Sequence, residues 1–214
     1  MLNELKKQVC AFNQLLPKEG LVTMTSGNCS GLDRETNLVV IKPSGVSFDK
    51  LSPDKMCVVD LNGRSVEGHY KPSTDTPTHL YVYRHLKHVG GIAHTHSNYA
   101  TSFAALGKSI PPYLTAIADE FGGAIPIGKY CKIGGDEIGQ EIVRIIGNRP
   151  AILMKNHGVF TVGKGIAEAF KAAVMVEDVA KTVHLSLLIG KPKLIPAQEV
   201  DRGHKRYMEK YGQG

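Results

Sequence analysis

The amino-acid sequence predicts a single α/β domain over residues 1–214, in which helices cover a central mixed or antiparallel sheet. Three observations lead to this fold class. Segments with helical periodicity alternate along the chain with short β-branched segments. An Asn-Gly dipeptide between two of the short segments predicts an antiparallel hairpin. No repeat, low-complexity tract or linker divides the chain, and 42% hydrophobic residues suffice for one sizeable core.

The first expected elements are a helix, a strand and a hairpin. Apolar residues from Leu2 to Leu16 recur every three or four positions, and Pro17 ends the helical pattern. The β-branched run 37–42 (NLVVIK) predicts a strand that closes in the turn-prone sequence PSG. The segments MCVVDL and RSVEG flank Asn62-Gly63 and are expected to pair as the hairpin.

The centre of the chain is expected to alternate between helix and strand. Residues 75–85 have a helical pattern, with Pro77 tolerated in the first turn. Residues 90–96 (GGIAHTH) predict a strand, and residues 99–106 predict a helix after it.

The last expected elements are two helices separated by two short strands. Residues 135–146 predict a helix, and AILMKNHGVFTVG predicts strands on either side of His157-Gly158. Residues 166–188 form the longest expected helix, whose apolar positions fit one buried stripe. A dinucleotide-binding fold is not expected, because no G-x-G-x-x-G lies between a strand and a helix, and a Walker-type phosphate loop is also missing.

Composition narrows the classes of function. The net charge is +6, but the basic residues are dispersed, so we expect no nucleic-acid binding. A basic protein also attracts small anionic substrates. The four cysteines lie far apart and form no C-x-x-C pair, which indicates reduced thiols. No stretch approaches the roughly 20 apolar residues of a membrane span, and no signal-peptide pattern is present. We therefore expect a cytoplasmic protein without membrane attachment.

Three histidines are candidate metal ligands. His94 and His96 are two residues apart in an expected strand, so both imidazoles would project from the same face. His157 stands at the end of an apolar strand, before a flexible glycine, where a polar side chain can line a cleft. Neutral imidazole binds zinc and similar divalent metals. The alternatives are a buried structural histidine, a solvent-facing one and a turn histidine.

A carboxylate and three hydroxyl-rich segments could complete such a site. Asp75 stands where a helix begins, so it is either a metal-site carboxylate or an N-cap that accepts a backbone N–H. The segments 25–30 (TSGNCS) and 42–45 (KPSG), together with Ser73-Thr74, offer hydroxyls, backbone N–H groups and one ammonium to a phosphate. Each segment taken alone is more often a plain turn or cap.

Taken together, these segments resemble the class II aldolase/adducin-type family of zinc-dependent sugar-phosphate aldolases and epimerases. The motifs that carry the resemblance occur in order along most of the chain: GNCS, IKPSG, KPSTDTPTH, GGIAHTHS, Ala118-Asp119 and NHGVFTVGK. The resemblance implies the three-layer fold of that family. Within the family, KPSTDTPTH and the terminal YGQ are most similar to the L-ribulose-5-phosphate 4-epimerases, because the aldolases typically carry a glutamate where Asp75 stands.

The resemblance also implies roles for individual residues. The implied metal-site residues, for Zn²⁺ or else Mn²⁺ or Co²⁺, are Asp75, His94, His96 and His157. The implied substrate- and phosphate-binding residues are Gly27, Asn28, Lys42, Ser44, Gly45, Ser73 and Thr74. The implied catalytic residues are Asp119 and Tyr211 as acid/base groups, and Thr115. The substrate would be a small sugar phosphate.

An assembly of four identical chains is implied as well, with Asp119 and Tyr211 reaching the metal site of an adjacent subunit. The family epimerases carry a further histidine near the C-terminus, for which His204 is the nearest candidate. The segment after Gly122-Gly123 and the stretch before Tyr211 are both shorter than in a typical epimerase. Two alternatives therefore stay open, namely an aldolase of the L-fuculose-phosphate type and a non-catalytic, adducin-like interaction module.

Overall fold

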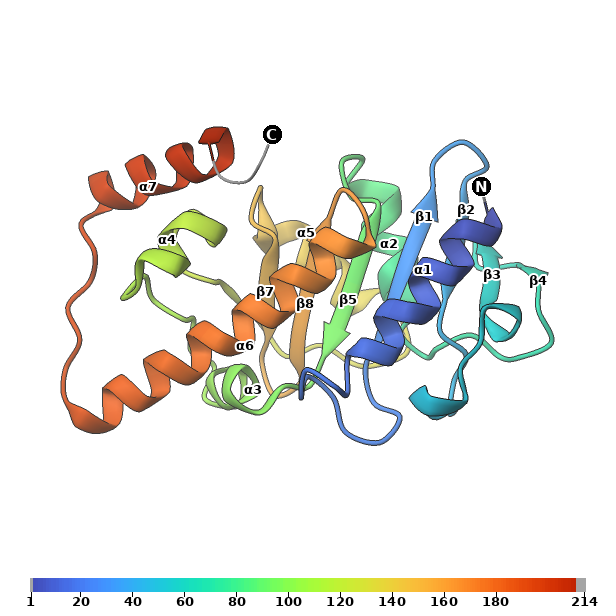
Figure 1. Ribbon diagram of the computed structural model, residues 1–214, viewed down its shortest axis with the longest axis horizontal. Coiled ribbons are helices and arrows are strands. Elements are labelled where there is room, and N and C mark those ends of the chain that lie inside the picture. Colours follow the sequence, from blue (N-terminus) through green and yellow to red (C-terminus); the bar gives the residue numbers. More distant parts are fainter. Residues whose placement is uncertain (1, 211–214) are drawn as a thin grey trace.

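A computed structural model describes residues 2–210 and contains one continuous eight-stranded sheet (Figure 1). The strands follow the spatial order β4-β3-β2-β1-β5-β8-β7-β6, and every neighbouring pair is antiparallel except β6 and β7, which are parallel. The strands are β1 (Asn28–Asp33), β2 (Leu38–Ile41), β3 (Cys57–Asp60), β4 (Ser65–Glu67), β5 (Gly91–Thr95), β6 (Ile127–Gly128), β7 (Ala151–Met154) and β8 (Gly158–Gly163). The predicted mixed sheet is confirmed.

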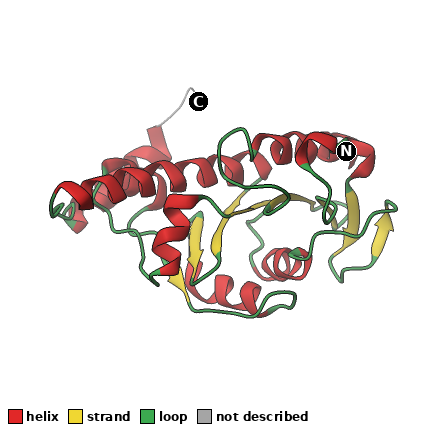
Figure 2. Cartoon of the chain, turned by 90° about the horizontal axis from the view of Figure 1, so that it is seen from below, coloured by secondary structure: helices red, strands yellow, loops and turns green. Residues whose placement is uncertain are grey.

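Helices cover both faces of this sheet and give the fold three layers (Figure 2). The helices are α1 (Leu2–Leu15), α2 (Thr76–His85), α3 (Asn98–Ala105), α4 (Thr115–Phe121), α5 (Glu137–Ile146), α6 (Ile166–Ile189) and α7 (Ala197–Lys210), with short 3-10 turns at Phe48–Lys50 and Pro53–Lys55. α1 and α6 cross one face, whereas α2 and α5 pack on the other (Figure 1).

Successive strand residues pack alternately into the two hydrophobic cores, one on each face of the sheet. Val39 and Ile92 pack against α2 and α5, whereas their neighbours Val40 and Ala93 pack against α1 and α6. Strands buried on both faces need apolar residues at nearly every position. This explains why β2, β7 and β8 read as continuous apolar runs and not as alternating patterns.

Every helix and strand expected from the sequence is present, with ends that differ by one or two residues. The structure adds β1, β6, α4 and α7, which were not expected. β1 excludes the alternative that residues 25–30 are only a plain turn, because Asn28 already begins a strand. Its sequence NCSGLD has no β-branched residue, but β2 and β5 pair with it on both sides.

Two further observations bear on the sequence-based expectations. All four cysteines are free, as expected for reduced thiols. Within residues 2–210, no helix combines the length and apolar character that crossing a bilayer requires.

Candidate active site

Three histidines from separate parts of the chain meet at one end of the sheet. His94 lies in β5, His96 follows that strand, and His157 immediately precedes β8. The ring centroids are 4.7 Å apart for His94 and His96, 4.8 Å for His94 and His157, and 5.2 Å for His96 and His157. Their candidate ligand nitrogens all lie within 4.8 Å of one another. The structure thus brings together the three imidazoles that the sequence marks as metal ligands.

The pairing of β5 with β8 produces this convergence. Thr95 pairs with Val159, so the residue just before β8 falls beside the end of β5. Asn156 adopts a left-handed conformation (φ +58°), which asparagine tolerates better than most residues in a tight turn. A Cβ atom on Gly158 would lie 2.4 Å from the Thr95 carbonyl oxygen, so this close approach requires glycine.

Hydrogen bonding and burial keep the imidazoles neutral. His94 Nδ1 donates to the Val159 carbonyl oxygen at 2.9 Å, because a carbonyl oxygen can only accept. His94 Nε2 therefore carries a lone pair, and it lies 3.0 Å from His96 Nε2. Burial lowers the pKa of His94 to about 3 and also lowers the pKa values of His96 and His157. Neutral imidazole is the form that binds a metal ion.

Asp75 precedes α2 but does not cap it. Its side chain accepts no hydrogen bond from the helix backbone. Instead, Asp75 Oδ2 accepts from Asn28 Nδ2 at 2.7 Å and from the Ser73 hydroxyl at 3.4 Å. Burial raises the pKa of Asp75, but the nearby His94 and His79 and the Asn28 amide outweigh burial and lower it. The carboxylate is ionised at neutral pH, and the capping role left open by the sequence is wrong.

This set of donors suits a divalent cation. Neutral imidazoles beside a carboxylate are ligands that zinc prefers and that manganese and cobalt accept. His157 Nδ1 is buried and has no hydrogen-bond partner in the described part of the chain, which leaves that nitrogen available to a ligand. The compact cluster consists of the three histidines. The role of Asp75 as a fourth ligand therefore stays a prediction.

The three segments predicted to hold phosphate lie side by side. The Ser73 N–H donates to the Lys42 carbonyl oxygen (3.0 Å), and the Ser73 hydroxyl accepts from Asn28 Nδ2 (3.1 Å). The Ser44 N–H donates to the Lys71 carbonyl oxygen (2.8 Å). The expectation of available backbone N–H groups is therefore wrong for Ser44 and Ser73. The Ser44 hydroxyl remains a candidate phosphate donor, and the Ser73 hydroxyl, which donates to Asp75 Oδ2 at 3.4 Å, stays a predicted contact.

Lysine and glycine residues shape the same region. Lys42 is 2% exposed, and its Nζ donates to the Thr25 carbonyl oxygen at 3.4 Å. Burial lowers the pKa of Lys42, while the nearby Asp75 carboxylate opposes that shift. Gly27 and Gly45 have positive φ values of +75° and +69°, which explains glycine at both positions.

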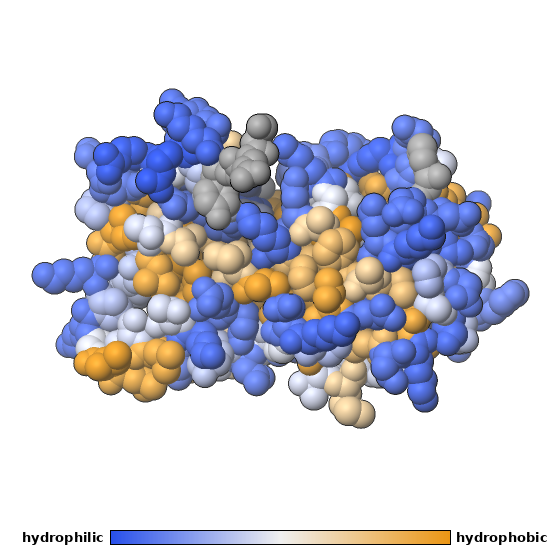
Figure 3. Space-filling view, viewed as in Figure 1, coloured by the Kyte–Doolittle hydropathy of each residue, from blue (hydrophilic) through white to orange (hydrophobic). Residues whose placement is uncertain are grey.

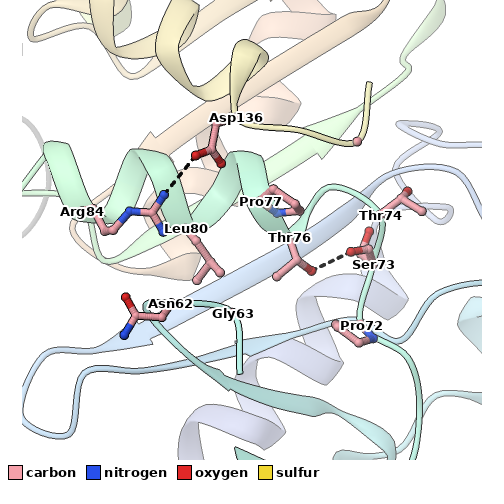
Figure 4. A pocket seen from close by; sticks show the side chains of 11 residues that line it. Asn62, Gly63, Pro72, Ser73, Thr74, Thr76, Pro77, Leu80, Arg84 and Asp136 are labelled. Carbon is pink, nitrogen blue, oxygen red and sulfur yellow. Dashed lines mark hydrogen bonds and ion pairs between the residues drawn. The ribbon is translucent and has the colours of Figure 1, made fainter. Parts of the chain in front are cut away.

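A cavity of about 560 Å³ opens beside the exposed Thr74 (Figure 4). Ser73 and Leu80 of α2 contribute to its wall, and the ion pair between Arg84 and Asp136 (3.5 Å) borders it. None of the residues lining it is one of the three clustered histidines. The cavity therefore adjoins the predicted phosphate segment and not the metal cluster.

The predicted acid/base group Asp119 lies on α4, which Thr115 begins. The Asp119 carbonyl oxygen lies 2.7 Å from Nδ1 of His204 on α7, and its carboxylate accepts from Arg206 at 3.1 Å. α4 and α7 lie at the opposite side of α6 from α1 (Figure 1). No hydrogen bond or ion pair within residues 2–210 joins Asp119 to the three clustered histidines. Tyr211 lies outside the described residues.

Sequence reasoning missed two residues near Asp75, namely His79 and Tyr83, which Ser30 of the predicted segment 25–30 joins. His79 is fully buried, and its Nδ1 lies 2.7 Å from Ser30 Oγ, which in turn lies 2.7 Å from the Tyr83 phenol oxygen. A signal was present, because Asp75, His79 and Tyr83 are each four residues apart. Residues at this spacing share one face of a helix.

Known proteins share this architecture. The family model described as Class II Aldolase and Adducin N-terminal domain matches residues 7–184. An L-fuculose 1-phosphate aldolase is 29% identical, with a TM-score of 0.91 over 96% of each chain. YgbL from Escherichia coli is 24% identical (TM-score 0.82; 95% of this chain and 99% of that chain). The L-fuculose 1-phosphate aldolase from Glaciozyma antarctica PI12 is 22% identical (TM-score 0.81; 95% of this chain and 81% of that chain). The last two show a common fold. Since the family model covers most of its length, the chain belongs to the class II aldolase and adducin N-terminal domain family.

Proposed function

We propose that this protein is a zinc-dependent L-ribulose-5-phosphate 4-epimerase, which breaks and re-forms the C3–C4 bond of a pentulose phosphate. The observation that carries the proposal is the cluster of His94, His96 and His157 beside the ionised Asp75. Asn28 and Ser73 each donate a hydrogen bond to the Asp75 carboxylate, and Asn28 also donates to Ser73. The predicted phosphate segments therefore adjoin the carboxylate. A sugar phosphate could therefore contact both parts of the site.

The protein residues would hold the cofactor and the substrate at separate points. His94, His96 and His157 would hold the zinc ion with Asp75, and the same donors also accept manganese or cobalt. When bound, the cation supplies a Lewis acid for negative charge on the sugar oxygens. In our proposal Gly27, Asn28, Lys42, Ser44, Gly45, Ser73 and Thr74 bind the substrate, chiefly its phosphate.

The proposed reaction avoids a difficult deprotonation. The C2 carbonyl activates only its neighbouring carbons, so C4 has no acidic proton. Breaking C3–C4 instead moves the bonding electrons into the C2 carbonyl and leaves an aldehyde. Asp119 would take the C4 hydroxyl proton, and Tyr211 would act from the opposite side after the aldehyde rotates. The aldehyde fragment carries the phosphate, so the phosphate segments would retain it until the bond re-forms and yields D-xylulose 5-phosphate.

A homotetramer with active sites between subunits would bring these groups together. Asp119 has no bond to His94, His96 or His157 of its own chain within the described residues, so its partner site belongs to a neighbour in this proposal. Large apolar side chains are also exposed near the end of α6, at the lower left of Figure 3. They are Leu185, Leu187, Leu188 and Ile189. The free cysteines favour a cytoplasmic location.

One experiment tests the activity. The purified protein, loaded with zinc, should convert L-ribulose 5-phosphate into D-xylulose 5-phosphate, and the His96→Ala variant serves as the matched inactive control. Absence of conversion by the zinc-loaded protein would reject the epimerase.

A second candidate activity is supported by the 29% identical L-fuculose 1-phosphate aldolase. An aldolase would release the free aldehyde from L-fuculose 1-phosphate, whereas the epimerase retains it. Measuring free aldehyde with each substrate separates the two activities. Metal content separates both from a non-catalytic, adducin-like module, which would have no need of bound zinc.

A further inference from the structure

One turn of helix α7 contacts Asp119, which lies on the neighbouring helix α4 (Figure 1). His204 Nδ1 donates to the Asp119 backbone carbonyl oxygen at 2.7 Å, because a carbonyl oxygen can only accept. Arg206 donates to Asp119 Oδ2 at 3.1 Å. A Cβ atom on Gly203 would lie 2.6 Å from Oδ1 of the same carboxylate. This turn therefore adjoins the backbone and both carboxylate oxygens of the proposed acid/base residue.

The two carboxylate oxygens of Asp119 have different surroundings. Oδ2 accepts from Arg206, whereas Oδ1 accepts no hydrogen bond within residues 2–210. The Asp119 side chain is 21% exposed, so the carboxylate is open to a group outside its own chain. In the proposed mechanism a proton passes to this carboxylate, and Oδ1 is the oxygen left for that transfer.

Glycine at position 203 is unfavourable for the helix itself. It stands in the interior of α7, where glycine is among the poorest helix formers. Both atoms that an added Cβ would meet within 4 Å belong to the Asp119 carboxylate group. To reach ordinary contact at 3.4 Å from its starting distance of 2.6 Å, Oδ1 would have to move by about 0.8 Å. The end of this short side chain can rotate, so a methyl group would turn the carboxylate and leave the helix intact.

The next residue of α4 holds α7 in this position. Glu120 accepts a hydrogen bond from the Tyr207 hydroxyl of α7 and forms an ion pair with Lys171 of α6 at 3.1 Å. The Glu120 side chain is only 11% exposed, so solvent screens these contacts less than those of an open surface pair. α7 is thereby tied to both α4 and α6, which keeps its contacting turn beside Asp119.

We propose that Gly203 and Arg206 are positioning residues for Asp119: Arg206 holds Oδ2, and the missing side chain at Gly203 leaves Oδ1 in the orientation that proton transfer requires. The inference rests on the proposed function, in which Asp119 is an acid/base group. Misplacing a reacting group by about 1 Å costs about a hundredfold in rate. The Arg206 side chain is 66% exposed, and exposed ion pairs contribute little to stability. Orientation of the carboxylate is therefore the effect expected of this pair.

Gly203→Ala tests the space beside Oδ1. On the zinc-loaded protein with L-ribulose 5-phosphate, kcat should fall by about a hundredfold, while KM and zinc affinity stay at the wild-type values. Alanine is a better helix former than glycine, so the Tm should not fall. A purely structural role would instead lower the Tm together with the activity. Wild-type kcat in Gly203→Ala would overturn the proposal.

The same substitution in an Asp119→Ala protein is the matched control. No carboxylate is left to displace, so Gly203→Ala should leave the residual kcat unchanged there. An equal fall in both backgrounds would show that the effect does not pass through Asp119 and would overturn the proposal. The contact is also tested without substrate, because Gly203→Ala should raise the Tm more in Asp119→Ala than in the wild type. Equal rises overturn the inference, whereas an inactive wild type rejects the epimerase alone.

Arg206→Met tests the contact at Oδ2. The variant keeps the apolar stem and loses the donor, so kcat should fall by about tenfold or more at unchanged Tm and zinc affinity. Arg206→Lys keeps a cation for Oδ2 and should recover part of the activity. Lys205→Met removes the neighbouring exposed cation of α7 and should leave kcat at the wild-type value. Equal kcat values in Arg206→Met and Lys205→Met would exclude Arg206 from this role.

Discussion

Replacing Gly158 with alanine tests how far the metal centre depends on the close packing of β5 and β8. The added Cβ would lie 2.4 Å from the Thr95 carbonyl oxygen and 3.5 Å from Cε1 of His94. Ordinary van der Waals contact begins at 3.4 Å, so the backbone must give way by about 1 Å. The contact is with backbone, which cannot move aside as the end of a long side chain can. His157 precedes Gly158 and must shift with it.

The expected effect has two parts. Overpacking a rigid core costs about 1–3 kcal/mol, which lowers Tm by about 2–12 °C for a chain of this length. Displacing the His157 ring should also lower zinc affinity by about tenfold or more, as when the support of a metal ligand is lost. Thermal unfolding of the metal-free protein measures the first effect. Competition with a chelator measures the second.

Gly190→Ala provides the matched control. A Cβ at Gly190 meets no atom within 4 Å, and the residue has an extended φ of 179°. The free energy of unfolding of the Gly190→Ala variant should therefore differ from that of the wild type by less than about 0.5 kcal/mol, and its zinc affinity should be the same. A Gly158→Ala protein with the Tm and zinc affinity of the wild type would refute the steric reasoning.

Three further predictions concern the site residues. His96→Ala should abolish turnover and bound zinc together, and a variant that retains its zinc by metal analysis would exclude His96 as a ligand. Tyr211→Phe should lower turnover by about a hundredfold or more while zinc content stays constant, and normal turnover would remove Tyr211 from the mechanism. The third concerns pH: burial lowers the pKa of His79 from 6.5 to about 4, so below pH 6.5 only the unfolded chain gains this proton. The contribution of His79 to the free energy of unfolding of the metal-free protein is fully present above pH 6.5. It falls by about 3 kcal/mol as the pH is lowered toward 4. His79→Gln should remove that part of the acid sensitivity in denaturant titrations, and an identical pH dependence in both proteins would contradict the assignment.

Local patterns were enough to locate elements whose residues carry their own preference. β2 and β7 are runs of branched and apolar residues, and α6 has a continuous apolar stripe. The Asn62-Gly63 turn likewise joins β3 and β4 as expected. In each of these cases backbone geometry and side-chain periodicity act over a few residues, so the sequence is sufficient.

Elements without such a pattern could not be predicted. β1 contains Asn28, Ser30 and Gly31, which have low strand preference, and it exists because two neighbouring strands pair with its backbone. α4 is only seven residues long, too short for a clear periodicity. α7 is a polar helix that packs on α4 through contacts such as the one between His204 and Asp119.

The same division holds for the candidate site. The sequence by itself determined which side chains had the right chemistry, and it placed His94 and His96 together because residues two apart in a strand share a face. Only the tertiary structure decided that His157 joins them, since that requires β8 to pair with β5 across a long stretch of chain. It also decided that Asp75 bonds to Asn28 and leaves the helix uncapped. Contacts of this kind depend on which distant segments pack together, and no local spacing of residues encodes that choice.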